Sequence, residues 1–390
     1  MGLTEYPGNR GGDLFEKFQQ WRNSLAGSRR FQSWAARFPL VKYLARRDGE
    51  KLFDLVAGFS YSQTLQAFVA FDLATHLKAG SRSAADLALR CDVPQRRMEV
   101  LCQAAAALGL LKRSKDAKFA LARLGAAVPG VPGLREMILH HDVLYRDLRD
   151  PVAFFRGETD TELAGFWPYV FGAAGDVDPE IAQTYSQLMS DSQVLVAEET
   201  LKAVDLSSCG KLLDIGGGTG AFLSAVGASY PDLALQLFDL PEVAPHAQAR
   251  FEREGLADRA SITTGSFRED SIPEGASTIS LVRVLYDHQD DTVRGLLAKV
   301  FKALPENGSL IISEPMSGGS KPDRTADAYF ALYCMAMRTG CVRSADRISQ
   351  LLSEVGFADI SQRATDRPFI TRVVTARKLS NQLDKSVNNI

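Results

Sequence analysis

The sequence predicts an α/β protein in which a mostly parallel sheet, closed by a C-terminal antiparallel hairpin, follows a helical domain of winged-helix-like pattern. Three observations predict this class. From about residue 206, strand-like and helical patterns alternate, which is typical of a parallel sheet covered on both faces. Residues 51–205 have almost entirely helical periodicity. The stretch KLLDIGGGTGAF, residues 211–222, joins an apolar strand to an apolar helix through three consecutive glycines.

Length, charge and cysteine content limit the possible classes of protein. A chain of 390 residues is too long for one ordinary core, so we expect two domains. The net charge of −2 gives no basis for global nucleic-acid binding. The five cysteines are never spaced as C-x-x-C, which argues against a disulfide framework or a zinc site. Because no apolar run approaches the length of a membrane span, we expect a soluble, cytoplasmic protein.

Four segments are expected along the chain. Residues 1–50 form a basic amphipathic arm, in which Lys and Arg alternate with bulky aromatics over residues 14–50. Residues 51–205 form the helical domain, residues 206–378 the sheet domain and residues 379–390 a polar tail. The composition of the arm is typical of an interfacial helix whose cations face anionic lipid, and packing of the arm on a partner subunit is the alternative.

The helical domain contains a pattern typical of a winged helix. Helical segments at 84–91 and 94–111 meet at the Val93-Pro94 turn, and two short strand-like pieces about a charged turn follow them. Longer helical segments are expected at 51–78 and 178–204. Residues 51–111 have more apolar helix surface than one winged helix can bury, so we expect an intimate homodimer with intertwined helical domains.

The sheet domain contains seven expected strands. Five of them alternate with helices and are therefore expected to be parallel, and the last two form the closing antiparallel pair. The expected strands are 211–215, 234–239, 260–264, 277–283, 308–313, 357–362 and 369–376.

The glycine-rich turn is compatible with two classes of ligand. GGGTGA satisfies both the G-x-G-x-x-A pattern of dinucleotide folds and a D-x-G-x-G-x-G pattern of adenosylmethionine folds. Two acids favour the second. Asp214 precedes the glycines, where a carboxylate would repel a pyrophosphate but could favour a methionine ammonium group. Asp239 ends the second strand, where it is placed to bind both ribose hydroxyls.

Five stretches follow one another in a characteristic order and spacing: LLDIGGGTG, FDLPEV, ISLVRVLYDHQDD, LIISEPM and VGFADI. With them, residues 51 to about 378 resemble the small-molecule O-methyltransferases that carry a winged-helix dimerisation domain. Three further stretches are FDLVAGFSYSQTL, LHHDVLYRDLRDPVAFFRG and DAYFALYCMAMRTGCVRSADRI. These resemble the hydroxyneurosporene (demethylspheroidene) O-methyltransferases of carotenoid biosynthesis in phototrophic bacteria.

The resemblance implies a Rossmann-like class I methyltransferase domain that uses S-adenosyl-L-methionine (SAM) and releases S-adenosyl-L-homocysteine. It implies transfer to the tertiary 1-hydroxyl of an acyclic carotenoid, while another phenolic or pigment acceptor, such as a bacteriochlorophyll precursor, stays open. A carotenoid partitions into the lipid bilayer, so we expect peripheral contact of residues 14–50 with an anionic inner or photosynthetic membrane. The apolar residues expected to line the pocket are Phe154, Phe155, Phe166, Trp167, Tyr169, Tyr329, Phe330, Tyr333, Met335 and Met337.

The resemblance also assigns the residues that bind the cofactor. Gly216, Gly218 and Gly220 would line the methionine end, and Asp239 would hold the ribose. Ser266 stands where plant relatives have an acid near the adenine, so stacking on Phe267 would contribute more than charge. The remaining residues of this expected set are Asp214, Leu240, Arg283 and, on the helix that roofs the cofactor, Met189 and Ser190.

The catalytic base is where the chain departs from the plant-type pattern. Tyr286 occupies the position of the catalytic His, and His288 lies two residues later. One bracing acid, Glu314, is retained, and the other falls on Val342. We expect His288 or His141 to act as the base, with Tyr286 and Glu314 orienting.

Two functions of other classes compete with methyl transfer. The winged-helix segment would suit a DNA-binding regulator that senses SAM, but its second helix offers only Arg96 and Arg97 as cations. The glycine pattern alone also permits a nicotinamide-dependent oxidoreductase. No metal is expected, because no acid cluster accompanies the cofactor motif.

Overall fold

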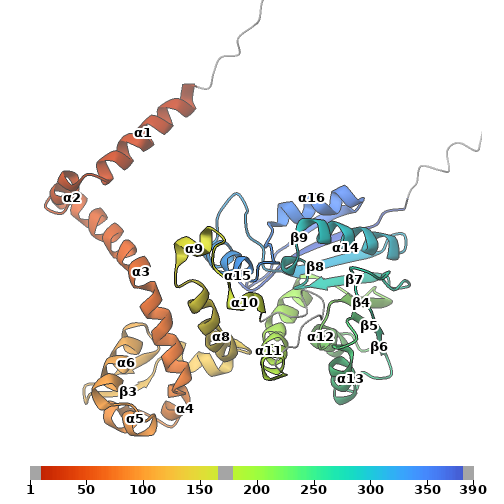
Figure 1. Ribbon diagram of the computed structural model, residues 1–390, viewed down its shortest axis with the longest axis horizontal. Coiled ribbons are helices and arrows are strands. Elements are labelled where there is room, and N and C mark those ends of the chain that lie inside the picture. Colours follow the sequence, from red (N-terminus) through yellow and green to blue (C-terminus); the bar gives the residue numbers. More distant parts are fainter. Residues whose placement is uncertain (1–9, 166–178, 381–390) are drawn as a thin grey trace, which may run out of the picture. The chain divides into compact units, whose positions relative to one another are not determined.

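The computed structural model describes residues 10–165 and 179–380 (Figure 1). The chain forms two compact units, Met1–Gly125 and Ala126–Ile390, which we call unit 1 and unit 2. The helices between residues 126 and 203 belong to the same unit as the large sheet. The division between the units therefore lies well before the boundary expected at residue 205.

Unit 1 begins with helices that carry many exposed apolar side chains. These helices are α1 (Arg10–Ala26), α2 (Arg29–Ala35), α3 (Pro39–Ala70) and α4 (Leu73–Leu77). Helix α2 begins at Ser28, whose hydroxyl accepts a bond from the Phe31 N–H, and α3 begins at a proline, which lacks the N–H that a first turn leaves unpaired. The exposed apolar side chains of α3 include Leu52, Phe53, Leu55, Val56 and Phe59. An apolar face of this extent indicates a protein contact surface.

The rest of unit 1 has the predicted winged-helix arrangement. Its elements are β1 (Arg82–Ser83), α5 (Ala84–Arg90), α6 (Gln95–Ala107), β2 (Leu111–Arg113), β3 (Lys118–Leu121) and α7 (Arg123–Ala127). The three strands pair antiparallel in the order β1-β3-β2. The core of this region includes the fully buried Phe68, Leu87 and Met98.

In the described part of unit 2, seven strands form one sheet. They are β4 (Lys211–Ile215), β5 (Ala234–Asp239), β6 (Ala260–Thr264), β7 (Thr278–Val282), β8 (Ser309–Glu314), β9 (Ala358–Arg363) and β10 (Arg372–Arg377). Their order is β6-β5-β4-β7-β8-β10-β9, and β10 runs antiparallel between β8 and β9 while the other pairs are parallel. The predicted fold class is confirmed, and each strand begins and ends within three residues of its expected bounds.

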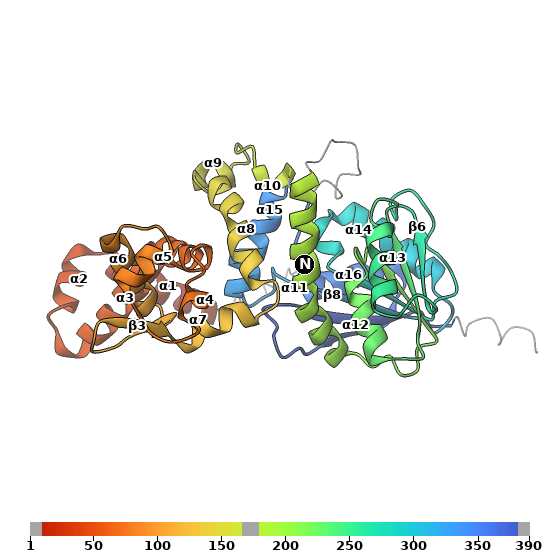
Figure 2. The ribbon, with the colours of Figure 1, turned by 90° about the horizontal axis from the view of Figure 1, so that it is seen from below.

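Helices cover both faces of this sheet (Figures 1 and 2). Helices α14 (Asp290–Ala303) and α16 (Ala345–Val355) bury Leu296 and Leu351 in one apolar core. Helices α11 (Pro179–Ala203), α12 (Ala221–Ser229) and α13 (Ala244–Arg253) contribute Val196, Phe222 and Phe251 to a second core. The carboxyl ends of β4 to β8 lie at one sheet edge, where ligands bind in open α/β folds.

A third apolar cluster lies in unit 2, between the segment after β7 and a group of shorter helices. These helices are α8 (Leu134–Asp147), α9 (Pro151–Phe155), α10 (Glu162–Gly165), the π-helical η4 (Ala326–Phe330) and α15 (Ala331–Ala336), with the 3-10 turns η1 (Val128–Gly130) and η3 (Leu285–Asp287) nearby in sequence. The buried members of the cluster include Leu144, Phe154, Tyr286 and Tyr333. We use the name acceptor wall for this apolar cluster together with the helices α8, α9, α10, η4 and α15 that pack against the segment after β7.

Candidate cofactor and acceptor site

The glycine-rich loop follows β4 and leaves open space at one position. Gly216, Gly218 and Gly220 all have left-handed backbone, with φ of 68°, 58° and 76°. A Cβ at Gly216 would lie 3.0 Å from Val284, and one at Gly220 would lie 2.7 Å from Phe251. A Cβ at Gly218 would meet no described atom within 4 Å. Close packing therefore explains Gly216 and Gly220, whereas Gly218 faces the space available to a ligand.

Asp239, at the end of β5, lies against this loop. Its Oδ2 accepts a bond from the Gly218 N–H at 2.7 Å, and its Oδ1 accepts one from the Leu240 N–H at 2.7 Å. Burial raises the pKa of this carboxyl above its usual range. The carboxylate is thus held beside Gly218 by two backbone donors, in the place expected for the acid that binds a ribose diol.

We expect Asp239→Ala to weaken SAM binding by roughly 1.5–3 kcal/mol, the scale of hydrogen bonds to a charged group. Isothermal calorimetry on the purified protein measures this change. Asp205→Ala is a matched control, because Asp205 also accepts a backbone bond, from Ser207 at 2.9 Å, but lies before β4 and away from the loop. Equal affinity of the Asp239→Ala variant and the parent would remove Asp239 from the site.

Asp214 lies beneath the glycine loop. Its side chain is fully buried, and the Ser280 hydroxyl donates to its Oδ1 at 2.6 Å. Its Oδ2 has no hydrogen-bond partner among the described residues and lies 2.2 Å from where a Cβ at Gly217 would stand. Burial, and to a smaller extent the charge of Asp239, raise the pKa of Asp214 to about 7. Asp214 therefore supports the loop from below, and Gly217 must be a glycine to make room for it.

The loop after β6 contains the residues expected near an adenine. Ser266 donates its N–H to Asp270 Oδ2 at 2.8 Å, and Phe267 makes an edge contact with His288 at 5.3 Å between ring centroids. Arg268 lies 3.1 Å from Nδ1 of His288, which must accept because a guanidinium only donates. Burial first, then nearby guanidinium charges, lower the pKa of His288 to about 4. His288 is therefore a neutral ring packed beside Phe267.

Glu314 braces the backbone of the turn after β7. Its Oε2 accepts the N–H groups of Leu285 at 3.0 Å and Tyr286 at 3.2 Å. Burial raises the pKa of Glu314 to about 7, and its Oε1 has no partner among the described residues. Burial also raises the pKa of the Tyr286 phenol. Glu314 thus orients Tyr286 through its peptide group.

Arg283 links the end of β7 to the roof helix α11. Its backbone is left-handed, with φ of 60°, which is unusual for a side chain of this size. One guanidinium nitrogen donates to Ser192 Oγ at 2.8 Å, and another lies 3.5 Å from the Tyr286 hydroxyl.

Asp287, which lies in the same turn as Tyr286, was not predicted as a site residue from the sequence, although burial raises its pKa to about 8. Its place between Tyr286 and His288 in YDH was the available sequence signal.

Two adjacent histidines of α8 bond to two tyrosines of the opposite helices. His140 Nε2 lies 2.7 Å from the Tyr333 hydroxyl, and His141 Nε2 lies 2.7 Å from the Tyr329 hydroxyl. Burial lowers the pKa of His140 to about 4 and also lowers the pKa of His141. Burial raises the pKa of the Tyr329 phenol, and the nearby positive charge of Arg283 partly offsets that rise. His141 therefore lies on the same side of unit 2 as Arg283.

Several expectations fall outside what the structure describes. Met189 and Ser190 belong to α11, but their side chains are not described. Phe166, Trp167 and Tyr169 lie in the undescribed stretch 166–178. Among residues 10–165 and 179–380, no His, Cys, Asp and Glu side chains are grouped as a metal site would require. Within the same ranges, no helix is long and apolar enough to cross a membrane.

The fold and the loop together define a class of protein. A parallel sheet ending in an antiparallel hairpin, with an open glycine at the end of β4 and an acid at the end of β5, is the architecture of a class I SAM-dependent methyltransferase. The residues fit SAM, because Gly218 leaves room for the ligand and Asp239 lies beside that room.

The comparisons with known proteins narrow this class to a family. Residues 145–358 match the O-methyltransferase domain, and residues 53–128 match the O-methyltransferase dimerisation domain. The chain therefore belongs to the O-methyltransferase family and is a SAM-dependent O-methyltransferase. The dimerisation domain supports a homodimer. This assignment decides against the oxidoreductase and the DNA-binding regulator that the sequence left open.

Individual relatives agree with the family. The chain is 52% identical to the demethylspheroidene O-methyltransferase of Cereibacter sphaeroides, over 92% of this chain and 94% of that protein. It is 51% identical to the Rhodobacter capsulatus protein of the same name, over 91% and 88%. The crystal structure of human N-acetylserotonin methyltransferase with SAM has a TM-score of 0.73 at 24% identity, over 85% of this chain and 98% of that one. The last likeness shows the shared fold.

Proposed function

We propose that the protein methylates the tertiary 1-hydroxyl of an acyclic carotenoid of the hydroxyneurosporene or demethylspheroidene type. The 52% identity to a demethylspheroidene O-methyltransferase, over nearly the whole length of both chains, carries this proposal. The acceptor wall supports it, because its buried Leu144, Phe154 and Tyr333 are apolar or aromatic and would suit a polyene chain.

The contacts of the two candidate bases favour His141. His288 already accepts a bond from Arg268 and packs on Phe267, so its ring belongs to the cofactor side of the site. His141 lies on the acceptor wall, and the Tyr329 hydroxyl, which donates to Met137 Sδ at 3.4 Å, is able to accept from His141 Nε2–H at 2.7 Å, so Nδ1 is the ring nitrogen that would take up a proton. A buried ring with a lowered pKa is neutral at physiological pH and is able to take up one proton.

The residues then divide the chemistry between them. When bound, SAM supplies an electrophilic methyl group on a sulfonium sulfur. Gly218, Asp239 and Leu240 would hold it at the strand ends, and Gly216 and Gly220 would shape the loop through their packing. Ser266, Phe267 and Arg283 would enclose it, with Met189 and Ser190 as the expected roof. Tyr286 orients the acceptor, with Glu314 fixing the backbone of Tyr286. A tertiary alcohol is a weak acid, so its proton leaves late, and His141 takes it up as the new C–O bond forms.

The test is an assay of the purified protein with methyl-labelled SAM. A 1-hydroxylated acyclic carotenoid and a panel of phenols are offered separately at matched concentrations. We expect label to enter the carotenoid as a methyl ether and the phenols to remain unlabelled. Faster labelling of any phenol would overturn the proposed acceptor while leaving the methyltransferase assignment in place.

We also propose that the basic arm brings the enzyme to an anionic membrane. The aromatic side chains Phe18, Trp21, Trp34 and Tyr43 are exposed on the helices of the arm, among its many cations. Such a surface would place its aromatics at the headgroup level and its cations against anionic lipid. Because carotenoids dissolve in lipid, this contact would give the acceptor wall access to its substrate. Packing of the arm on the partner subunit is the competing possibility.

We expect the protein to co-sediment with anionic liposomes at low salt and to be released at high salt, because screening weakens lipid attraction. A variant lacking residues 1–47 should lose this binding and still bind SAM. Trp21→Ala removes an aromatic that is 60% exposed in the arm, and Phe155→Ala is its control, because Phe155 is 64% exposed but lies in unit 2. The first should weaken sedimentation and the second should not. Undiminished binding of the truncated variant would exclude the arm as the membrane contact.

A further inference from the structure

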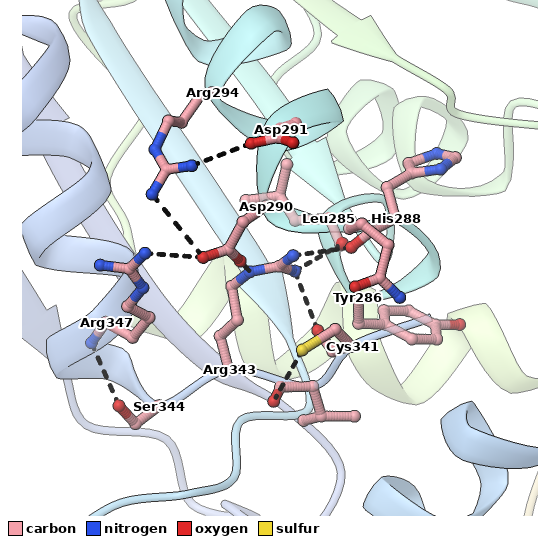
Figure 3. A network of polar contacts seen from close by, with 12 residues as sticks. Leu285, Tyr286, His288, Asp290, Asp291, Arg294, Cys341, Arg343, Ser344 and Arg347 are labelled. Carbon is pink, nitrogen blue, oxygen red and sulfur yellow. Dashed lines mark hydrogen bonds and ion pairs between the residues drawn. The ribbon is translucent and has the colours of Figure 1, made fainter. Parts of the chain in front are cut away.

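Arg343 is a buried arginine that no sequence motif singled out. Its side chain is 1% exposed, and the residue lies two positions before the start of α16. Its Nε donates to Asp290 Oδ1 at 2.7 Å. Its Nη1 donates to the carbonyls of Leu285 at 2.9 Å and Cys341 at 2.8 Å, and its Nη2 donates to the carbonyl of His288 at 2.7 Å. Figure 3 shows the guanidinium between Asp290 and these carbonyls.

These bonds hold the turn 285–288 on its carbonyl side. Glu314 binds the same turn on its N–H side, and the Cys341 N–H donates to the Tyr286 carbonyl at 2.8 Å. Two side chains of this turn, those of Tyr286 and His288, have different neighbours. Tyr286 belongs to the acceptor wall, whereas His288 packs on Phe267. A shift of this turn would therefore displace both sides of the site together.

We propose that Arg343 is a positioning residue for methyl transfer, which sets the places of His288 and Tyr286 at once by fixing the carbonyls of their turn. A guanidinium suits this task because its planar fork presents donors in fixed directions, whereas one ammonium group cannot reach all four acceptors from a single place. The inference rests on the site roles proposed above, but it does not depend on the identity of the acceptor.

Arg347 provides a matched control on the same carboxylate. Its Nη2 donates to Asp290 Oδ2 at 2.6 Å, and its side chain is 31% exposed. Its other described ion pair is with Glu354, on its own helix, so its side-chain contacts in the described structure do not reach the turn. Arg347→Lys therefore removes a guanidinium from Asp290 and leaves the carbonyls of the turn bonded.

The experiment compares Arg343→Lys with Arg347→Lys in the full-length protein. Calorimetry gives the Kd for SAM. Initial rates with methyl-labelled SAM and the 1-hydroxylated acyclic carotenoid give kcat and the KM for SAM, and thermal unfolding gives the Tm. We expect Arg343→Lys to raise the Kd about tenfold, which corresponds to about one lost hydrogen bond, and to lower kcat about a hundredfold through misplacement. Arg347→Lys should leave both within about twofold. A purely structural role would lower Tm and the folded fraction without changing the Kd or KM of the folded enzyme.

Two further variants separate the possible outcomes. Asp290→Asn keeps the three carbonyl bonds of Arg343 and should behave like Arg347→Lys. If Arg343→Lys fails to fold, Arg343→Gln replaces it, because its planar amide keeps two donors but loses the guanidinium fork, and the same losses of SAM affinity and kcat are expected. Unchanged Kd and kcat in Arg343→Lys, or equal damage in Asp290→Asn, would overturn the inference. Phe267→Ala tests the underlying site: if it leaves the SAM affinity unchanged, the proposed cofactor side is wrong, independently of Arg343.

Discussion

Gly218→Val is expected to abolish SAM binding, raising the Kd at least about a hundredfold, equivalent to about 2.8 kcal/mol. The position has left-handed backbone, and a Cβ there would enter space free of described atoms, beside the N–H that bonds Asp239. A branched side chain would fill the volume that the ligand needs. The backbone strain costs about 1–2 kcal/mol, which a domain of this size tolerates.

Gly255→Val is the control for that strain. Gly255 has φ of 69°, and a Cβ there would also meet no described atom within 4 Å, but it lies between α13 and β6. Both variants should lose similar thermal stability, and only Gly218→Val should lose SAM binding by calorimetry. If both bind SAM like the parent, Gly218 does not face the ligand.

His141→Ala is expected to lower turnover by roughly 10²–10⁴-fold and to leave the affinity for SAM nearly unchanged. In the proposed mechanism His141 takes up the proton of the acceptor, and it belongs to α8 and bonds to Tyr329 rather than to a residue of the glycine loop. His140→Ala is the control, because His140 makes an equivalent 2.7 Å bond, to Tyr333. It should perturb α8 to a similar degree with a much smaller loss of turnover.

The pH profile gives a second readout of the base. Burial lowers the pKa of His141 below its ordinary 6.5, and the base works in its neutral form, so activity is present above this pKa and lost as the pH falls through it. We therefore expect the acid limb of kcat/KM below pH 6.5, and its disappearance in His141→Ala. A limb near pH 7 that persists in that variant would belong to Glu314 or Asp214, because burial raises the pKa of each carboxyl to about 7.

Other variants distinguish the remaining mechanisms. If His288→Ala lowers turnover at unchanged SAM affinity while His141→Ala has no effect, His288 is the base. If only Tyr286→Phe lowers turnover, the proton leaves through the phenol. Near-full activity in all three would show that proximity of the hydroxyl and the methyl group carries the reaction without a general base.

The fold was predictable because each level of the sequence indicates the same structure. The central strands of unit 2 are short and mostly apolar runs such as KLLDI, in which only the first residue is not buried, so their period and length both indicated strands. The cofactor loop was predictable for a similar reason, since left-handed backbone at Gly218 has few alternatives to glycine. The division of the chain at Gly125 was not predicted, because helical periodicity does not show which neighbour a helix packs against.

The catalytic side was less predictable, since its contacts join residues far apart in the chain. His141 contacts Tyr329 and His140 contacts Tyr333 across nearly 200 residues, and the sequence indicated His141, Tyr329 and Tyr333 as site residues without pairing them. The role of Arg343 could not be predicted from the sequence for another reason. A lone arginine in a polar stretch is usually solvated, and only burial against three carbonyls shows its task.

The separation between α8 with α15 and the strands β4 to β7 has a consequence for evolution. In the proposed site, α8 and α15 face the molecule that receives the methyl group, and the ends of the strands face SAM. After gene duplication, substitutions on α8 and α15 would alter which alcohol enters, while selection on the strand ends would keep the donor constant. On this arrangement, a change of acceptor needs substitutions only on these helices and leaves the left-handed glycine loop after β4 as it is.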